Sequence, residues 1–186
     1  MDRARTVCLS KLLSFGLRHD PEALRLELDP AGWTSIDAVL AGLAAHGDTV
    51  TREELEEVVR SSDKKRFALS NDGARIRASQ GHTIEVDLGL PSRAPPEFLF
   101  HGTAERVVAA IRREGLVPGS RTHVHLSADL RTAEIVAKRR EGPHIILRAQ
   151  AAAMHAAGLA FFLSDNGVWL TAHVPPEFLK PHGGQP

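Results

Sequence analysis

Residues 64–80, KKRFALSNDGARIRASQ, constrain the fold of this chain more than any other stretch. Two runs that alternate apolar and polar residues flank Asp72-Gly73, a dipeptide that favours a two-residue hairpin turn. That turn would pack one apolar face, with the cross-strand pairs Leu69–Ile76 and Phe67–Ala78. The opposite face would then carry three cations, Arg66, Arg75 and Arg77. A three-residue loop would mix the two sets, because a slip of one residue moves every side chain to the other face.

Helical spacing precedes this hairpin. Residues 6–17 predict an amphipathic helix with a single apolar stripe made of Cys8, Leu9, Leu12, Leu13 and Leu17. Asp20 and Pro21 suit the first positions of a new helical turn. Residues 35–46 predict a second helix that ends at Gly47, and residues 51–60 a third that opens with a Thr51–Glu54 capping box. Helices followed by such a hairpin suggest a winged-helix arrangement.

Three prolines within residues 88–98 interrupt the pattern and predict a domain boundary, which we place between 1–92 and 93–186. The second half alternates strands and helices. We expect strands at 98–103, 122–127 and 144–149, helices at 104–114 and 129–140, and a strand pair within 161–174. The overall expectation is an α+β fold of two lobes.

Composition limits the classes of protein that this chain can represent. Its 186 residues are 42% apolar, which is enough for a packed core. The net charge is zero, so any anion has to be held by a local group of cations. The single cysteine, Cys8, excludes an intrachain disulfide and a cysteine-based zinc site. With no signal-peptide pattern and no apolar run long enough to span a bilayer, we expect a cytoplasmic protein without a membrane partner.

The residues that carry chemistry are individually unremarkable. Arg18 and His19 end the first helix, where cations are common because they stabilise the helix dipole. His123 and His125 share one side of a predicted strand, but no third ligand follows at a recognisable spacing, so we expect no metal. His101, Gly102 and Thr103 end a strand in a way that suits a nucleotide. Trp33 and Trp169 are interpreted as core residues.

Taken together and in order, the motifs LSKLLSFGLRH, KKRFALS, IRASQGHTIEVD, FLFHGT, RTHVHLS and SDNGVWL resemble the RNA 2′-phosphotransferase (tRNA 2′-phosphotransferase) family over nearly the whole chain. The resemblance implies a winged-helix-like N-terminal lobe and a C-terminal lobe of the ADP-ribosyltransferase type that binds NAD. It also implies an RNA-repair or tRNA-splicing reaction on an internal RNA 2′-phosphate in a tRNA-like substrate. Such an enzyme would act as a monomer and would need no metal.

The same resemblance assigns residues. The family's catalytic Arg-His-Arg-Arg quartet maps to Arg18, His19, Arg66 and Arg121, with Arg139 or Arg140 as the alternative for the last. Arg77 and Lys64 map to phosphate or RNA contacts. NAD binding maps to His101, Gly102, Thr103, His125, Ser127 and Val168. Three positions differ from the family pattern, namely Ser79 for asparagine, Thr83 for serine and Ala137 for glycine.

Physical chemistry is consistent with these roles. Arginines stay protonated, so they can clamp and stabilise a phosphate but cannot transfer protons. His19 is the only quartet member that titrates near neutrality, which makes it the proton donor or acceptor. Val168 cannot act as a base, which is tolerable when the nucleophile is an anionic phosphate.

Two alternatives remain open at this point. The same fold could ADP-ribosylate a terminal nucleic-acid phosphate or a protein, or it could be a non-catalytic winged-helix nucleic-acid binder with an NAD-sensing lobe.

Overall fold

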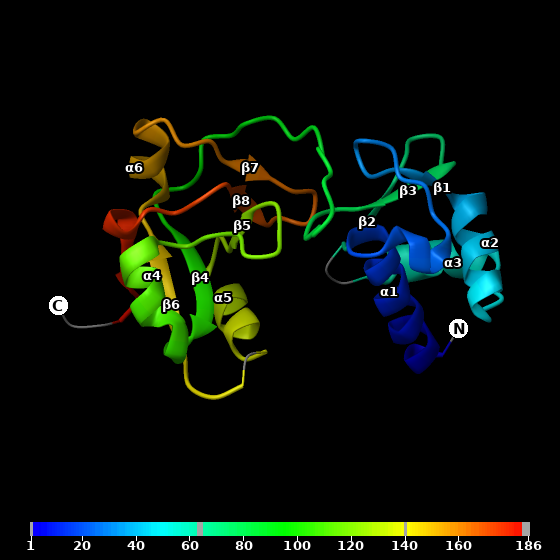
Figure 1. The fold of residues 1–186 in the computed structure, drawn as a ribbon, viewed down its shortest axis with the longest axis horizontal. Helices are drawn as coiled ribbons and strands as arrows, with labels where there is room; N and C mark the ends of the chain where they lie inside the picture. The colour runs from blue at the N-terminus through cyan, green and yellow to red at the C-terminus, as the bar shows by residue number, and fades with distance from the viewer. Residues whose placement is uncertain (1, 63–64, 140, 184–186) are drawn as a thin grey trace. The chain divides into compact units, whose positions relative to one another are not determined.

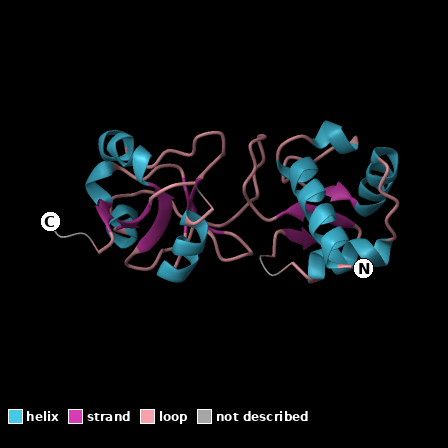
Figure 2. Cartoon of the chain, turned by 90° about the horizontal axis from the view of Figure 1, so that it is seen from below, coloured by secondary structure: helices cyan, strands magenta, loops and turns pink. Residues whose placement is uncertain are grey.

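The computed structural model describes residues 2–62, 65–139 and 141–183 of the chain and divides it into two compact units, Met1–Gly89 and Leu90–Pro186. Both units combine helices with short strands (Figures 1 and 2). Each is a mixed α/β assembly built on small antiparallel sheets. The boundary between the two units lies between Gly89 and Leu90, within the proline-containing segment 88–98.

Unit 1 contains three α-helices and one three-stranded antiparallel sheet among its described residues. The elements are α1 (Arg3–Arg18), η1 (Pro21–Leu24), β1 (Thr34–Ser35), α2 (Ile36–His46), α3 (Arg52–Arg60), β2 (Phe67–Leu69) and β3 (Arg75–Ala78). The Thr51–Glu54 capping box is present at α3, and Gly47 ends α2 with a φ of 102°. Asp20 accepts a hydrogen bond from the amide of Ala23 and so begins η1, as expected.

The hairpin has the predicted register, with Phe67 opposite Ala78 and Leu69 opposite Ile76. Its turn is larger than expected. The amide of Gly73 donates to the carbonyl of Ser70, so the tight turn spans Ser70–Gly73 rather than consisting of Asp72-Gly73 alone. Gly73 has a φ of 67°, a conformation that suits glycine.

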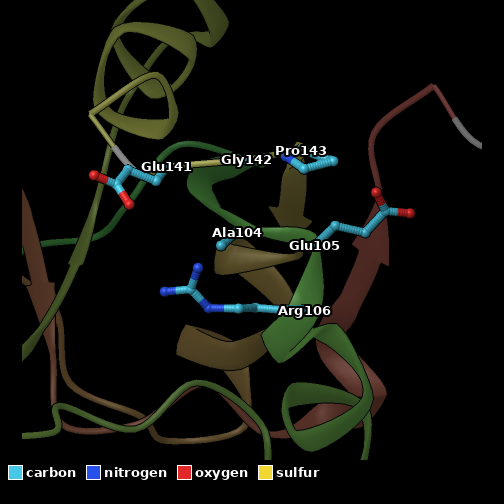
Figure 3. A pocket seen from close by; sticks show the side chains of 6 residues that line it. All are labelled: Ala104, Glu105, Arg106, Glu141, Gly142 and Pro143. Atoms are coloured by element: carbon cyan, nitrogen blue, oxygen red, sulfur yellow. The ribbon is translucent and has the colours of Figure 1, made fainter.

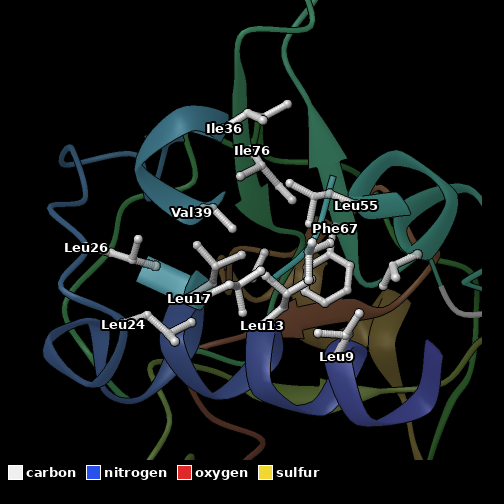
Figure 4. Close-up of a cluster of buried hydrophobic side chains, with 14 residues drawn as sticks. Leu9, Leu13, Leu17, Leu24, Leu26, Ile36, Val39, Leu55, Phe67 and Ile76 are labelled. Carbon is white, nitrogen blue, oxygen red and sulfur yellow. The ribbon is translucent and has the colours of Figure 1, made fainter. Parts of the chain in front are cut away.

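The core of unit 1 forms where α1 faces the sheet and the other two helices. Leu9, Leu13 and Leu17 of α1 are buried and lie with Ile76 and Phe67 of the hairpin (Figure 4). Cys8 was expected on the same stripe, but it is exposed, because it lies one position away from the buried leucines along the helix. Gly42 of α2 is also required by packing, since a Cβ there would come within 2.1 Å of the carbonyl oxygen of Leu24.

Among its described residues, unit 2 contains two three-stranded antiparallel sheets, in the orders β4-β6-β9 and β5-β8-β7. Its elements are β4 (Leu99–Ala104), η2 (Glu105–Val107), α4 (Val108–Glu114), β5 (Val124–Leu126), α5 (Leu130–Ala137), β6 (His144–Ala149), α6 (Ala151–Ala156), β7 (Phe162–Leu163), β8 (Trp169–Thr171), η3 (Pro176–Phe178) and β9 (Leu179–Pro181). The core lies among Leu99, Leu126, Leu147, Phe161 and Trp169.

Three further features of the fold differ from expectation. The alanine-rich segment after β6 forms a short helix, α6, and the C-terminal segment adds the edge strand β9, neither of which was expected. Trp169 is buried, as expected, but Trp33 is only half-buried, and its ring lies beneath the guanidinium groups of Arg75 and Arg77 at 5.6 and 4.6 Å. No helix in the described part of the chain has the length and apolar character needed to cross a membrane.

Candidate functional site

The C-terminal end of α1 is attached to the base of the hairpin in unit 1. Arg18 is the last residue of α1, and its Nη2 donates to the backbone carbonyl of Arg66 at 3.1 Å. Arg66 directly precedes β2, and the same carbonyl also accepts the amide of Ser79 at 2.9 Å. The structure thus brings together two arginines that lie 48 residues apart in the sequence.

His19 follows as the C-cap of α1 and is exposed. Its Nδ1 lies 3.0 Å from the hydroxyl oxygen of Thr83. The backbone makes a second link, because the amide of Thr83 donates to the carbonyl of Arg18 at 2.9 Å. The segment after β3 therefore fixes both the end of the helix and the imidazole that the sequence singled out.

A buried histidine, His82, lies beside this arrangement with only 1% of its surface exposed. Burial is the main cause that lowers the pKa of His82 from 6.5 to about 4, and the charges of Arg18, His19 and Arg77 lower it as well. This effect shows that three predicted site residues are close enough to act on one side chain. Unit 1 therefore gathers cations around the end of α1, which is the environment that a phosphate needs.

Arg77 is partly committed to the fold. Its Nη1 donates to the carbonyls of Leu88 at 3.1 Å and Ala31 at 3.4 Å, and its guanidinium covers Trp33. These contacts hold the turn before β1 against the hairpin. Lys64, the other predicted phosphate contact, lies outside the described residues.

Ser79 is a member of this site that sequence reasoning had treated only as a departure from the family pattern. It is buried, its hydroxyl donates to the carbonyl of Lys65 at 2.8 Å, and its amide binds Arg66. It therefore fixes the backbone that carries Arg66. The sequence signal was its place opposite Arg66 in the register that the hairpin predicts.

In unit 2, Arg121, His125 and His101 form a chain of contacts. The Nη1 of Arg121 lies 2.6 Å from the Nδ1 of His125, and the Nδ1 of His101 lies 3.0 Å from the carbonyl oxygen of His125. A guanidinium can only donate, so the Nδ1 of His125 accepts and its proton is on Nε2. A carbonyl can only accept, so His101 carries a proton on Nδ1.

Gly102 and Thr103 follow His101 on β4 and are buried. A Cβ on Gly102 would come within 2.2 Å of the carbonyl oxygen of Ala133 and 2.8 Å of the Cβ of Ala137, both on α5. Gly102 is therefore needed for the close approach of α5 to β4. This packing explains the glycine whether or not a nucleotide contacts it.

Ser127 directly follows β5, and Val168 directly precedes β8. The amide and carbonyl of Ser127 both bond to Phe100 of β4. The register of β5 with β8, in which Leu126 is opposite Trp169, places Val168 opposite Ser127 when it is continued by one residue. The backbone of Val168 pairs with Ser164 in the turn between β7 and β8. His101 thus lies on β4, His125 lies on β5, and Val168 directly precedes β8.

Unit 2 also has a hollow of about 280 Å³ that contains none of the predicted site residues (Figure 3). It is lined by Ala104, Glu105, Arg106, Glu141, Gly142 and Pro143. Its two carboxylates and one guanidinium do not select one class of ligand. Across residues 2–62, 65–139 and 141–183, no group of three or more His, Cys, Asp or Glu side chains is arranged to hold a metal ion.

The predicted residues are therefore distributed over both units. Unit 1 brings together Arg18, His19, Arg66 and Arg77, and unit 2 brings together Arg121 with His101 and His125. Ser127 and Val168 extend the second group along the strands.

Comparison with known proteins points to one family. Residues 4–173 match the family model described as RNA 2′-phosphotransferase, Tpt1/KptA family. A protein of Streptomyces coelicolor named "Probable RNA 2′-phosphotransferase" is 53% identical over 180 residues, which is 97% of each chain. A protein of the same name from Pseudomonas fluorescens is 52% identical over 92% of this chain and 94% of its own length. Another from Trichormus variabilis is 48% identical over 96% of this chain and 98% of its own length.

Proposed function

This chain belongs to the RNA 2′-phosphotransferase family, and we propose that it transfers an internal RNA 2′-phosphate to the ADP-ribose part of NAD. The products would be RNA with a 2′-hydroxyl, nicotinamide and ADP-ribose 1″,2″-cyclic phosphate. The observation that supports this proposal most directly is the contact of Arg18 with the backbone of Arg66 beside His19. It brings three members of the expected quartet into one part of unit 1.

In the first step, an oxygen of the RNA 2′-phosphate would attack the anomeric carbon of the nicotinamide ribose. The bond from that carbon to nicotinamide breaks, and nicotinamide leaves as a neutral molecule. The nucleophile is already an anion, so this step needs no general base. Val168, whose side chain cannot act as a base, is compatible with a step that needs none.

In the second step, the ribose 2″-hydroxyl would attack phosphorus, and the bond from phosphorus to the RNA 2′-oxygen breaks. One proton leaves the attacking hydroxyl and one is gained by the departing oxygen, so this step needs a group that titrates. We assign that role to His19. Arg18, Arg66 and Arg121 would stabilise the charge on the transferring phosphoryl group, each contact contributing about 3 kcal/mol.

Unit 2 would supply the NAD contacts. His101, Thr103, His125 and Ser127 come from adjacent strands, and a hydroxyl or imidazole N–H can donate to ribose and amide oxygens. We propose that unit 1 is the winged-helix-like lobe and unit 2 the ADP-ribosyltransferase-type lobe. The helices with a β-hairpin in unit 1 and the two small sheets in unit 2 are compatible with those assignments.

The test is a direct assay with NAD and an oligoribonucleotide that carries one internal 2′-phosphate. Loss of the phosphate together with release of the cyclic product is the expected result. An adduct in which RNA is joined through its phosphate to ADP-ribose, and which never resolves, would support transfer to a phosphate without the second step. Absence of any NAD consumption would contradict the proposal.

The division of labour between the steps can be tested with variants. Arg18→Ala and Arg66→Ala should let the adduct accumulate, because the arginines act mainly where charge develops on phosphorus. Arg60→Ala is the matched control, since Arg60 is an exposed arginine of unit 1 paired with Glu57 at the end of α3. Equal loss of both steps in the two site variants would contradict this division.

A further inference from the structure

Thr83 stands where the family pattern has serine and is not a member of the expected quartet, but its side chain contacts His19. Its hydroxyl oxygen lies 3.0 Å from the Nδ1 of His19 and 3.4 Å from the carbonyl oxygen of Arg18. Its amide donates to the same carbonyl at 2.9 Å. Thr83 thus contacts the catalytic pair of α1 at three points from a segment 64 residues away.

These contacts allow an arrangement in which the hydroxyl of Thr83 both donates and accepts a hydrogen bond. A hydroxyl has one proton to donate and lone pairs to accept with. If its proton goes to the carbonyl of Arg18, the hydroxyl oxygen accepts from Nδ1–H of His19. In the neutral imidazole the lone pair is then on Nε2, and in the imidazolium the same bond persists because Nδ1 still donates.

The surroundings explain why a hydroxyl suits this position. Arg18 and Arg77 are permanent cations near His82, and His82 itself is buried and neutral above about pH 4. A carboxylate in place of the hydroxyl would pair with these cations and weaken their attraction for a phosphate. A hydroxyl orients the ring without changing the net charge of the cluster.

The imidazole of His19 also has an aromatic neighbour. The ring of Phe15, one helical turn earlier on α1, lies 6.3 Å from the ring of His19 at an interplanar angle of 45°. The imidazole is therefore bounded by an aromatic ring from its own helix and by a hydroxyl from the segment after β3. Both contacts restrict the rotation of the ring.

We propose that Thr83 is the positioning residue of His19, and that its hydroxyl holds the imidazole with a proton on Nδ1 so that Nε2 is the nitrogen that exchanges a proton with the substrate. The catalytic part of this inference rests on the proposed function. The tautomer and the orientation of His19 are properties of the protein alone and can be measured without substrate.

The first experiment is a long-range ¹H–¹⁵N spectrum of protein labelled with ¹⁵N-histidine, at a pH where His19 is neutral. The signals of His19 are assigned by their loss in His19→Gln. Wild type should show the Nδ1–H pattern. Thr83→Val keeps the shape and removes the hydroxyl, and it should shift His19 to mixed tautomers, whereas Thr83→Ser should retain the wild-type pattern. A wild-type Nε2–H pattern, or no difference between wild type and Thr83→Val, would overturn the proposal.

The second experiment is kinetic. Thr83→Val should lower the rate of phosphate release by about 10-fold or more, since general acid–base groups contribute 10²–10⁴-fold. The KM for NAD should be unchanged, and Thr83→Ser should restore the rate. An equal rate in all three proteins would overturn the catalytic role. If wild type consumed no NAD, the proposed function would fail, and the spectra would still decide the positioning role.

The melting temperatures of the two Thr83 variants serve as the control for correct folding. The hydrogen bond from the backbone amide of Thr83 to the carbonyl of Arg18 is present in either variant, and Thr83 is exposed, so both variants should melt within a few degrees of wild type. A merely structural role of the hydroxyl would lower the melting temperature of Thr83→Val and would leave the tautomer of His19 unchanged.

Discussion

The buried imidazole of His82 should make unit 1 lose stability in mild acid. In the folded protein the pKa of His82 is lowered to about 4 from 6.5. Between these values the unfolded chain binds a proton that the folded chain does not, so stability falls as pH falls through this window. The full loss below pH 4 is about 3 kcal/mol. Between pH 8 and pH 5 the loss is about 2 kcal/mol.

The assay is urea unfolding followed by tryptophan fluorescence. The chain has two tryptophans, so a Trp169→Phe background leaves Trp33 as a reporter of unit 1 alone. We expect the change in unfolding free energy between pH 8 and pH 5 to shrink by about 2 kcal/mol in His82→Leu, which removes the titrating group. His46→Gln removes an exposed imidazole of the same unit and serves as the control.

A shrinkage below about 0.5 kcal/mol in His82→Leu would refute the reasoning, because the buried ring would then not be the group that binds the proton on unfolding. The same conclusion would follow if His46→Gln reduced the pH dependence as much as His82→Leu.

Two further predictions concern packing and capping. Gly102→Ala should destabilise unit 2 by about 1–3 kcal/mol, because the added Cβ meets the backbone of α5. Urea unfolding reported by Trp169 in a Trp33→Phe background measures this change, and an unchanged unfolding midpoint would contradict the prediction. Thr51→Ala should lower the unfolding free energy of unit 1 by about 1 kcal/mol, because it removes the capping box of α3. Urea unfolding of this variant in the Trp169→Phe background would detect the change. The control Thr122→Ala, in unit 2, should leave that transition unchanged.

Local sequence pattern was sufficient for much of this fold. The register of the hairpin followed from the alternation on both sides of Asp72-Gly73, and the start of α3 followed from Thr51 and Glu54. Both depend on interactions within a few residues. The helix α6 was missed because an alanine-rich apolar run has no periodicity that separates a buried helix from a buried strand.

The site was less accessible to this reasoning. The family resemblance named Arg18, His19 and Arg66, but no pattern in the sequence could pair the ring of His19 with Thr83, or place Trp33 under two arginines. Those contacts join segments that are distant in the chain and depend on tertiary packing. Cys8 shows the converse error, since helical spacing alone placed it on the buried stripe, whereas packing leaves it outside.

The partners of the three site histidines limit which of them can carry a proton. The Nδ1 of His125 accepts from Arg121, a group that cannot accept in return, so protonating that nitrogen would break the contact. His101 donates to a carbonyl and keeps that bond in either charge state, as does His19 when it donates to the hydroxyl of Thr83. His125 is thereby restricted to a neutral role that orients Arg121. Of the two remaining imidazoles, only His19 belongs to the unit that holds Arg18 and Arg66, the arginines proposed to bind the phosphate. We therefore assign proton transfer to an oxygen on that phosphate to His19, an assignment that rests on the proposed phosphate-binding role of Arg18 and Arg66.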